Sequence, residues 1–321
     1  MLRRPLPVHG VTVGVHIVAR TAPELVDGIV AAEQAGVECA WLTVGGLAPD
    51  PFAVFGAAAM RTSRIKFGTS IVPTFPRHPL AMAQGAAAVD ALAPGRLRLG
   101  VGPSHKPVIE GTWGIPFERP LEHLREYLTI LKAILGTGSI AFEGKRLIAR
   151  GSIGGPTGVT VMASALRANG FRLCGELADG AISWVCPLPY LRDVAIPAIR
   201  QGAEKAGRTP PPLVAHIPVV VSEDADAVRE GARRQIGIYP RVPFYQQMFA
   251  DAGFPEALEG QLSDRMIDAL VVHGSAEAVK ARLREAPAFG AGEILAMPIL
   301  PPGDREALPR TLAALGELAA E

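Results

Sequence analysis

Short runs of apolar residues alternate along this chain with segments in which apolar residues recur every three or four positions. The first run is "VTVGV" at 11–15, and the helical pattern of "APELVDGIVAAEQAG" follows it at 22–36. Thr21 suits the start of that helix as an N-cap. The alternation continues and yields eight apolar runs, at 11–15, 37–44, 65–72, 95–102, 158–164, 180–185, 212–221 and 293–300.

This rhythm predicts the fold class. Strands that are apolar on both faces are typical of parallel sheets covered by helices. Eight such strand–helix units predict an α/β fold of the (β/α)8 TIM-barrel type in a single domain over 1–321. A doubly wound open sheet is the alternative, but the even spacing favours a closed barrel. Two segments interrupt the rhythm: 137–158 predicts a hairpin that turns at Glu143–Gly144, and 222–272 predicts a helical insertion before the last strand.

Composition and charge narrow the range of partners. Hydrophobic residues make up 49% of the chain and aromatic residues 6%, and the net charge is +1. These values argue against a nucleic-acid or acidic-membrane surface and favour a small-molecule partner. No apolar run approaches the roughly 20 residues of a membrane span, and the first sixteen residues lack the apolar core of a signal peptide. The three separated cysteines (Cys39, Cys174 and Cys186) fit a reduced, cytoplasmic location.

The carboxyl ends of the strands hold few acid–base groups. In TIM barrels the chemistry lies at these ends, yet Glu38 and Glu293 stand at the opposite ends of their strands. His16, His105 and His216 lie on separate strands with no carboxylate beside them, so no metal site is predicted. The paired carboxylates of glycosidases are also missing. An apolar, neutral cup of this kind is expected where a bound heterocycle performs the chemistry.

One stretch carries a specific resemblance. Residues 68–111, "GTSIVPTFPRHPLAMAQGAAAVDALAPGRLRLGVGPSHKPVIEG", and 175–185, "GELADGAISWV", resemble the luciferase-like monooxygenase superfamily in its coenzyme F420-dependent branch. The resemblance implies a barrel that binds a flavin or deazaflavin at the strand ends, and a homodimer. It implies either F420 or, as the alternative, FMN as the cofactor.

The resemblance also assigns cofactor-contacting positions. It implies a non-prolyl cis peptide at Ser70–Ile71 or Ile71–Val72, behind the cofactor ring. It places the cofactor phosphate near Arg167, at the start of a helix that the backbone N–H groups of residues 163–166 would open after the fifth strand. The full set of implied cofactor-binding residues is Val44, Ser70, Ile71, Val72, Gly102, Pro103, Ser104, Ala163, Ser164, Ala165, Leu166 and Arg167.

The implied reaction is hydride transfer between F420 and a small organic substrate. His105 is the candidate proton donor, because imidazole titrates near neutral pH. Relatives that oxidise alcohols have an Asp-His pair where this chain has Val44–Gly45, which favours reduction of a C=C or C=N bond over alcohol oxidation. An FMN-dependent monooxygenase and a non-catalytic flavin-binding protein are the alternatives.

Several other side chains have two interpretations. Arg77 and His78 could meet the polyanionic tail of F420 or could serve solubility and helix capping. Trp184 is expected in core packing, with ring stacking as the alternative. Cys186 could line the pocket. The aromatic residues of the insertion suggest a pocket roof over an apolar ligand: Tyr239, Phe244, Tyr245 and Phe249.

Overall fold

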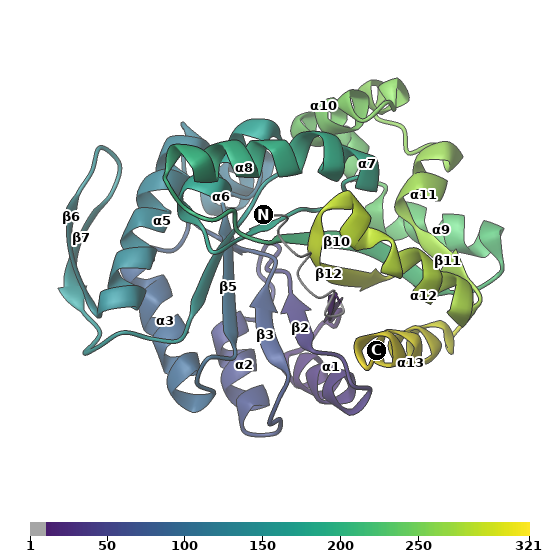
Figure 1. Cartoon of the computed structure of the whole chain (residues 1–321), viewed down its shortest axis with the longest axis horizontal. Helices are drawn as coiled ribbons and strands as arrows, with labels where there is room; N and C mark the ends of the chain where they lie inside the picture. Colours follow the sequence, from purple (N-terminus) through teal and green to yellow (C-terminus); the bar gives the residue numbers. More distant parts are fainter. Residues whose placement is uncertain (1–10) are drawn as a thin grey trace, which may run out of the picture.

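The structure is a computed structural model that describes residues 11–321. The expectation of no signal peptide concerns residues that lie mostly outside this range. The barrel strands are β1 (Thr12–His16), β2 (Cys39–Leu42), β3 (Lys66–Thr69), β5 (Leu97–Gly102), β8 (Thr160–Ser164), β9 (Gly180–Ile182), β10 (Leu213–Val221) and β12 (Ala291–Pro298). They pair in parallel in this order, and β12 pairs with β1, so the sheet closes on itself (Figure 1). The predicted (β/α)8 barrel is confirmed, and the alternative of an open sheet is wrong.

A ring of helices covers the outside of the barrel (Figure 1). The helices after the strands are α1 (Ala22–Gln34), α2 (Pro51–Ala59), α3 (Pro79–Leu92), α5 (Pro120–Thr137), α6 (Ala168–Leu177), α8 (Ile196–Lys205), α12 (Ala276–Arg284) and α13 (Ala307–Ala319). α1 begins as the sequence predicts, because Thr21 and Glu24 form a capping box. Shorter elements accompany these helices: α4 (Lys106–Trp113), α7 (Leu188–Tyr190), β4 (Val72–Pro73) and β11 (Val272–Gly274).

The predicted hairpin is present and stands apart from the barrel. β6 (Ser139–Glu143) and β7 (Ile148–Ser152) pair antiparallel and project beside α5 at the left of Figure 1. The carboxylate of Glu126 on α5 accepts backbone N–H groups from the turn residues Lys145, Arg146 and Leu147, each at 2.9 Å. Glu126 therefore fixes the turn of the hairpin to α5, and Arg146 adds ion pairs with Glu118 and Glu122.

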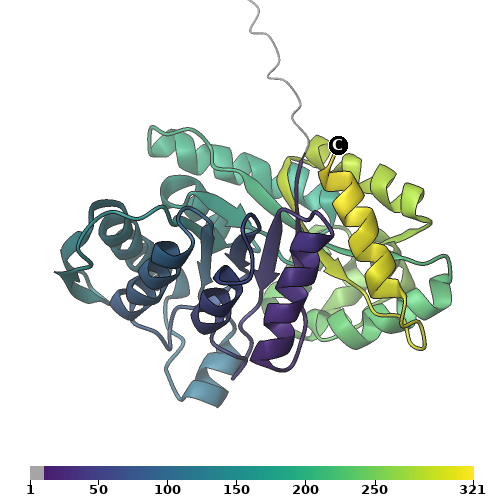
Figure 2. The same ribbon diagram turned by 90° about the horizontal axis from the view of Figure 1, so that it is seen from below.

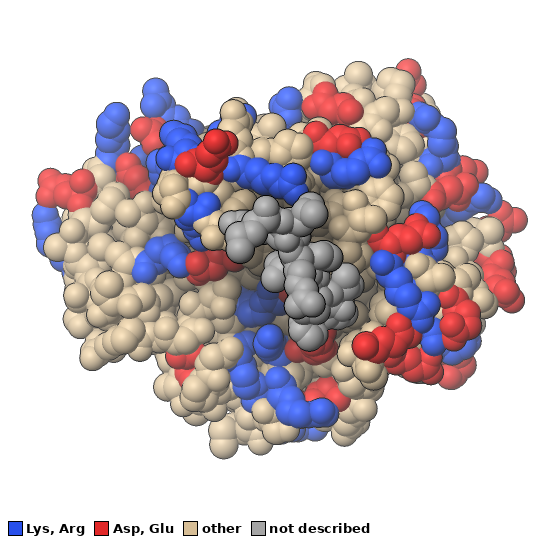
Figure 3. Space-filling view, viewed as in Figure 1, with Lys and Arg blue, Asp and Glu red and all other residues tan. Residues whose placement is uncertain are grey.

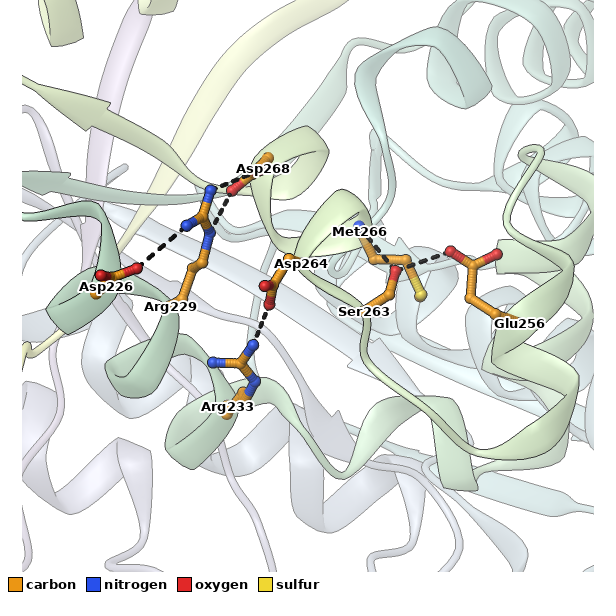
Figure 4. A network of polar contacts seen from close by, with 8 residues as sticks. All are labelled: Asp226, Arg229, Arg233, Glu256, Ser263, Asp264, Met266 and Asp268. Atoms are coloured by element: carbon orange, nitrogen blue, oxygen red, sulfur yellow. Dashed lines mark hydrogen bonds and ion pairs between the residues drawn. The ribbon is translucent and has the colours of Figure 1, made fainter.

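The predicted insertion contains α9 (Ala225–Ile236), α10 (Pro243–Asp251) and α11 (Asp264–Leu270). Arg229 donates to both carboxylate oxygens of Asp268 at 3.0 Å, and Arg233 pairs with Asp264 (Figure 4). These contacts tie α9 to α11. In Figure 2, the insertion helices and α4 lie toward the same end of the barrel, where the strands end.

Trp41 fills the middle of the barrel. Glycines stand on either side of it: a Cβ at Gly14 would lie 2.5 Å from the Trp41 Nε1, and a Cβ at Gly68 would lie 2.7 Å from Cζ3 and closer to other ring atoms. Trp41 is fully buried and packs in a cluster that the side chain of Ile71 covers. The barrel is thus a packed core with a solid floor beneath its carboxyl end.

An ion pair closes the barrel below Trp41. Arg98 pairs with Glu293, and the Arg98 guanidinium lies 5.2 Å from the centroid of the Trp41 ring. Burial raises the pKa of Glu293 above its ordinary value, although Arg98 and the Trp41 indole lower it. The sequence placed Glu293 at the end opposite the site, and the structure confirms this.

Acidic and basic side chains are interspersed over the face seen in Figure 3. Among residues 11–321, no helix is long and apolar enough to cross a membrane, and no group of His, Cys, Asp or Glu side chains could hold a metal ion.

Candidate functional site

The third barrel strand breaks where the site begins. β3 ends at Thr69, β4 begins at Val72, and the Ser70–Ile71 peptide bond between them is cis. The resemblance implied a cis bond at this place, and the structure confirms its position. The Ser70 carbonyl accepts the Thr43 hydroxyl at 3.1 Å, and the Val44 N–H donates to the Ile71 carbonyl at 3.3 Å. The end of β2 therefore holds the bulge in place.

Gly102 leaves room beside this bulge. A Cβ at Gly102 would lie 3.2 Å from Cγ1 of Ile71 and would clash with Oγ of Ser164. Ile71, Gly102 and Ser164 thus meet at the carboxyl ends of β3, β5 and β8. Gly100 differs from Gly102. The carbonyl of Thr69 and the side chain of Ile182 already fill the space that a Cβ at Gly100 would take. Gly100 is required for barrel packing, not for approach of a ligand.

Pro103 and Ser104 follow Gly102 and lead into α4, a helix that the sequence pattern did not predict. Ser104 has a positive φ of 62° and His105 occupies the N-cap position. The His105 ring lies 5.6 Å from the ring of Tyr245 in the insertion. Burial lowers the pKa of His105 below its ordinary value.

The turn after β8 differs from the expectation. Ala163 and Ser164 are the last residues of β8, and the Ala165 N–H donates to the Ile182 carbonyl at 2.9 Å. These residues therefore do not open the helix. α6 begins at Ala168, so the N–H groups available to an anion belong to its first turn, after Leu166. β8 ends at Ser164, where the sequence pattern predicts it to end, and the Ala165 N–H is used by β9, so the helix begins later than the resemblance implies.

The cations at the rim already have partners. Arg77 pairs with Asp50, Lys106 lies 3.8 Å from Glu110, and Arg167 lies 3.8 Å from Asp251.

Helix capping accounts for His78. It is the N-cap residue of α3, and its Nδ1 accepts the Leu80 N–H at 3.2 Å. A contact between the F420 tail and Arg77 stays a prediction, and it would have to compete with Asp50.

On the other side of the barrel mouth, three rings form what we call the imidazole–indole cluster: His16, Trp184 and His216. The Trp184 and His216 rings stack with centroids 3.8 Å apart, and the His16 ring meets Trp184 edge-on at 5.6 Å. They come from β1, from the end of β9 and from β10. Trp184 packs against the core, as expected, and stacking of its ring on a bound ligand stays a prediction.

The insertion covers this cluster as a roof. The Trp184 indole donates a hydrogen bond to the Tyr239 hydroxyl, and the rings of Tyr239 and Tyr245 lie 4.6 Å apart. Phe249 is buried and continues this packing, whereas Phe244 is 48% exposed and does not belong to the roof. Cys186 is buried, and burial raises the pKa of its thiol to about 12. It is therefore not an activated nucleophile.

Burial keeps the two histidines of the cluster neutral. It lowers the pKa of His16 to about 4, and it lowers that of His216 well below its ordinary value, with a further contribution from His16. Sequence reasoning used both histidines only to argue against a metal. Their positions in alternate, inward-pointing places on β1 and β10 were the signal that could have placed them together.

The mouth thus has two unlike halves. β2, β3, β5 and β8 present a surface of backbone, small side chains and Ile71, where Gly102 leaves space that a Cβ would fill. β9, β10 and β1 present aromatic rings and buried imidazole nitrogens. The first half offers the flat, uncrowded surface that a planar heterocycle needs, so the residues present suit the cofactor that the resemblance implies.

The family model "Luciferase-like monooxygenase" matches residues 8–293. The chain belongs to this family. It is 31% identical to an F420-dependent glucose-6-phosphate dehydrogenase of Nakamurella multipartita, over 79% of this chain and 77% of that protein. It is 26% identical to a 5,10-methylenetetrahydromethanopterin reductase of Methanolobus tindarius, over 86% and 90% of the two chains. The chain is therefore an enzyme of a family that contains F420- and flavin-dependent oxidoreductases.

Solved structures share the fold. An F420-dependent secondary alcohol dehydrogenase in complex with an F420-acetone adduct superposes with a TM-score of 0.81 at 17% identity, covering 96% of this chain and 98% of that one. The coenzyme F420-dependent tetrahydromethanopterin reductase of Methanopyrus kandleri gives 0.74 at 22% identity, covering 97% and 99%. An FMN-bound type II Baeyer-Villiger monooxygenase from Pseudomonas putida also gives 0.74, at 20% identity, covering 97% and 98%. The fold alone therefore does not separate F420 from FMN.

Proposed function

We propose that this protein is an F420-dependent oxidoreductase that transfers a hydride between the deazaflavin and a small organic substrate, in the direction of C=C or C=N reduction. The observation that carries this proposal is the surface at the ends of β3 and β5, where Ile71 packs on the Trp41 cluster and Gly102 leaves room beside it. The relatives named as F420-dependent support F420 over FMN.

When bound, the reduced deazaflavin supplies two electrons as a hydride. The chain's own residues would orient and enclose the ring. Ile71 would support one face of it, Gly102 would let it approach the backbone, and the first turn of α6 would face its phosphate. Trp41 beneath Ile71 keeps water out of the barrel below.

Reduction also consumes a proton, and His105 is the candidate donor at the rim. Its lowered pKa makes the imidazole mainly neutral at pH 7. A neutral imidazole is a weaker acid than the cation, so reduction is expected to speed up as the pH falls toward the pKa of His105. The end of β2 supports reduction over alcohol oxidation. The Val44 N–H donates to the Ile71 carbonyl, and neither Val44 nor Gly45 has a side chain that can remove a hydroxyl proton.

Titration of the purified protein with F420 and with FMN, followed by cofactor fluorescence, tests the choice of cofactor. We expect F420 to bind more tightly, and submicromolar binding of FMN alone would contradict the proposal in favour of a monooxygenase. His105→Ala should abolish turnover of enones or imines with F420 affinity unchanged. His78→Asn, which keeps an N-cap on α3, is the matched control and should leave turnover unchanged.

Two further expectations belong to the same proposal. A non-catalytic flavin-binding role would be indicated if cofactor bound but no compound in a panel of enones, imines and alcohols were turned over. The homodimer that the resemblance implies and the cytoplasmic location that the separated cysteines suggest stay predictions, and sedimentation analysis of the purified protein checks the first.

A further inference from the structure

His216 carries a buried hydrogen-bond donor with no partner. The ring is 1% exposed, and its Nδ1 accepts the Val185 N–H at 3.0 Å. Because Nδ1 is the acceptor and the ring is neutral, the proton of the imidazole is on Nε2. Among residues 11–321, no group accepts a hydrogen bond from this Nε2. Buried donors without acceptors are rare in native proteins and are often found at functional sites.

The tautomer of His216 is enforced from several directions. Val185 has a positive φ of 51°, which is uncommon for a β-branched residue, and this conformation accompanies the contact between its N–H and Nδ1. The His216 backbone N–H donates to the hydroxyl of Ser183, and the ring stacks on Trp184. The ring is therefore held in one orientation before any ligand arrives.

The groups that hydrogen-bond to the cluster are polar but uncharged. Its partners among the described residues are backbone groups, the Ser183 hydroxyl and the Tyr239 hydroxyl. Two charged side chains, Asp268 and Arg282, line the small cavity beside His216, and they pair with Arg229 and Glu285. No ion pair in the described part of the chain involves His16 or His216, and the rim cations Arg77, Lys106 and Arg167 each lie beside a carboxylate. A phosphate or carboxylate is normally bound by cations, so this half of the mouth is unsuited to an anionic substrate.

We propose that the imidazole–indole cluster is the substrate subsite, and that it selects an uncharged organic compound whose carbonyl or imine acceptor binds the Nε2–H of His216 against the Trp184 ring. This inference rests on the proposed function and names the substrate class for it. In a conjugated ketone, a hydrogen bond to the carbonyl oxygen stabilises the negative charge that this oxygen gains when hydride adds at the far carbon of the C=C bond. His216 is a positioning and polarising group in this subsite, and the proton that completes the reduction still comes from elsewhere.

Two substitutions of His216 separate this role from a structural one. The Oδ1 of Asn can replace Nδ1 as the acceptor for Val185 but reaches no further, so His216→Asn keeps the structural contact and loses the Nε2–H donor. The longer His216→Gln side chain places an amide N–H near the Nε2 position and loses the Val185 contact. A substrate role therefore predicts that Asn is the more harmful substitution for ligand binding, and a structural role predicts the reverse order.

Isothermal titration calorimetry with cyclohex-2-enone, on protein saturated with oxidised F420, measures this binding without turnover. We expect the enone to bind, His216→Asn to weaken it by about 3- to 10-fold, in line with the loss of one neutral hydrogen bond, and His216→Gln to weaken it less. Glucose 6-phosphate, the anionic probe, should bind more weakly than the enone. Tighter binding of glucose 6-phosphate, or Gln more harmful than Asn, overturns the proposal.

A measurement on the unmodified protein covers the case in which a variant does not fold. In ¹⁵N-histidine spectra, the Nε2 signal of His216 should be that of a protonated, neutral nitrogen and should shift when cyclohex-2-enone is added. An unchanged signal overturns the subsite. If neither F420 nor FMN binds, the proposed function fails, yet the enone titration of the cofactor-free protein still tests the subsite. If F420 binds and the enone does not, the subsite fails and the proposed function stands.

Discussion

A methyl group added at Gly68 should destabilise the whole barrel. In the folded chain the new Cβ would lie 2.7 Å from Cζ3 of Trp41, and nearer to Cε3 and Cδ2. The indole cannot move away, because a Cβ at Gly14 on its other side would already lie 2.5 Å from Nε1, and Arg98 stands below it. The indole ring is rigid, so the strain must be taken up by the strands themselves.

The expected cost is that of overpacking a closed core, about 1–3 kcal/mol. For a domain of this size we expect the midpoint of thermal unfolding to fall by roughly 2–4 °C for each kcal/mol. Urea titration and thermal unfolding followed by circular dichroism measure both quantities. Because Ile71 packs on the same cluster, Gly68→Ala should also weaken F420 binding.

Two further variants make the result interpretable. Gly111→Ala is the matched control: it lies in α4, a Cβ there meets nothing within 4 Å, and alanine should stabilise the helix slightly. Combining Gly68→Ala with Trp41→Leu should restore part of the loss, because the smaller side chain makes room for the methyl group. If Gly68→Ala unfolds at the wild-type temperature, or if Trp41→Leu adds its full cost to that of Gly68→Ala, then Trp41 does not fill the barrel as described.

Two other predictions concern buried charge. Arg98→Met removes the partner of Glu293 and should lower the free energy of unfolding by roughly 3–5 kcal/mol at pH 7. The loss should shrink as the pH is lowered, because burial raises the pKa of Glu293 and a protonated Glu293 needs no partner. Urea titrations of Arg98→Met and of Arg98→Met/Glu293→Leu check this, and an equally unstable double variant would contradict the explanation. Burial lowers the pKa of His123 from 6.5 to about 4, so between these pH values the unfolded chain binds more protons than the folded chain. The free energy of unfolding should therefore rise by about 3 kcal/mol from this residue between pH 4 and 6.5. His123→Phe should flatten that rise in urea titrations at pH 5 and 7, and an unchanged slope would exclude His123 as its source.

The sequence predicted the barrel because its signals are local and repeated. Continuous apolar strands, the N-cap Thr21 and the hairpin turn each depend on neighbouring residues, and all are found in the structure. α4 was missed because Pro103 and Pro107 frame its start and suggested a loop. The start of α6 was placed too early because the Ala165 N–H donates to the Ile182 carbonyl of β9, a tertiary interaction that the sequence does not show.

The sequence predicted only one of the two halves of the candidate site. The half at Ser70, Ile71 and Gly102 lies in one stretch of sequence that carries the family resemblance. The imidazole–indole cluster joins residues from 16 to 216, so its assembly follows only when strand alternation is combined with closure of the barrel. His216 owes its unpaired donor to the backbone of Val185, a contact that only the closed barrel creates.

Trp41 and the Arg98–Glu293 pair block the inside of the barrel, so a ligand can enter only at the carboxyl ends of the strands. Whatever enters the mouth last must leave first, and a molecule lying deepest is trapped until the one above it departs. Cofactor and substrate therefore cannot come and go independently if the ring occupies the deeper position. A barrel with one entrance favours ordered binding of the two ligands. Every proton taken up in the reaction must pass through the same entrance, beneath Tyr239 and Tyr245.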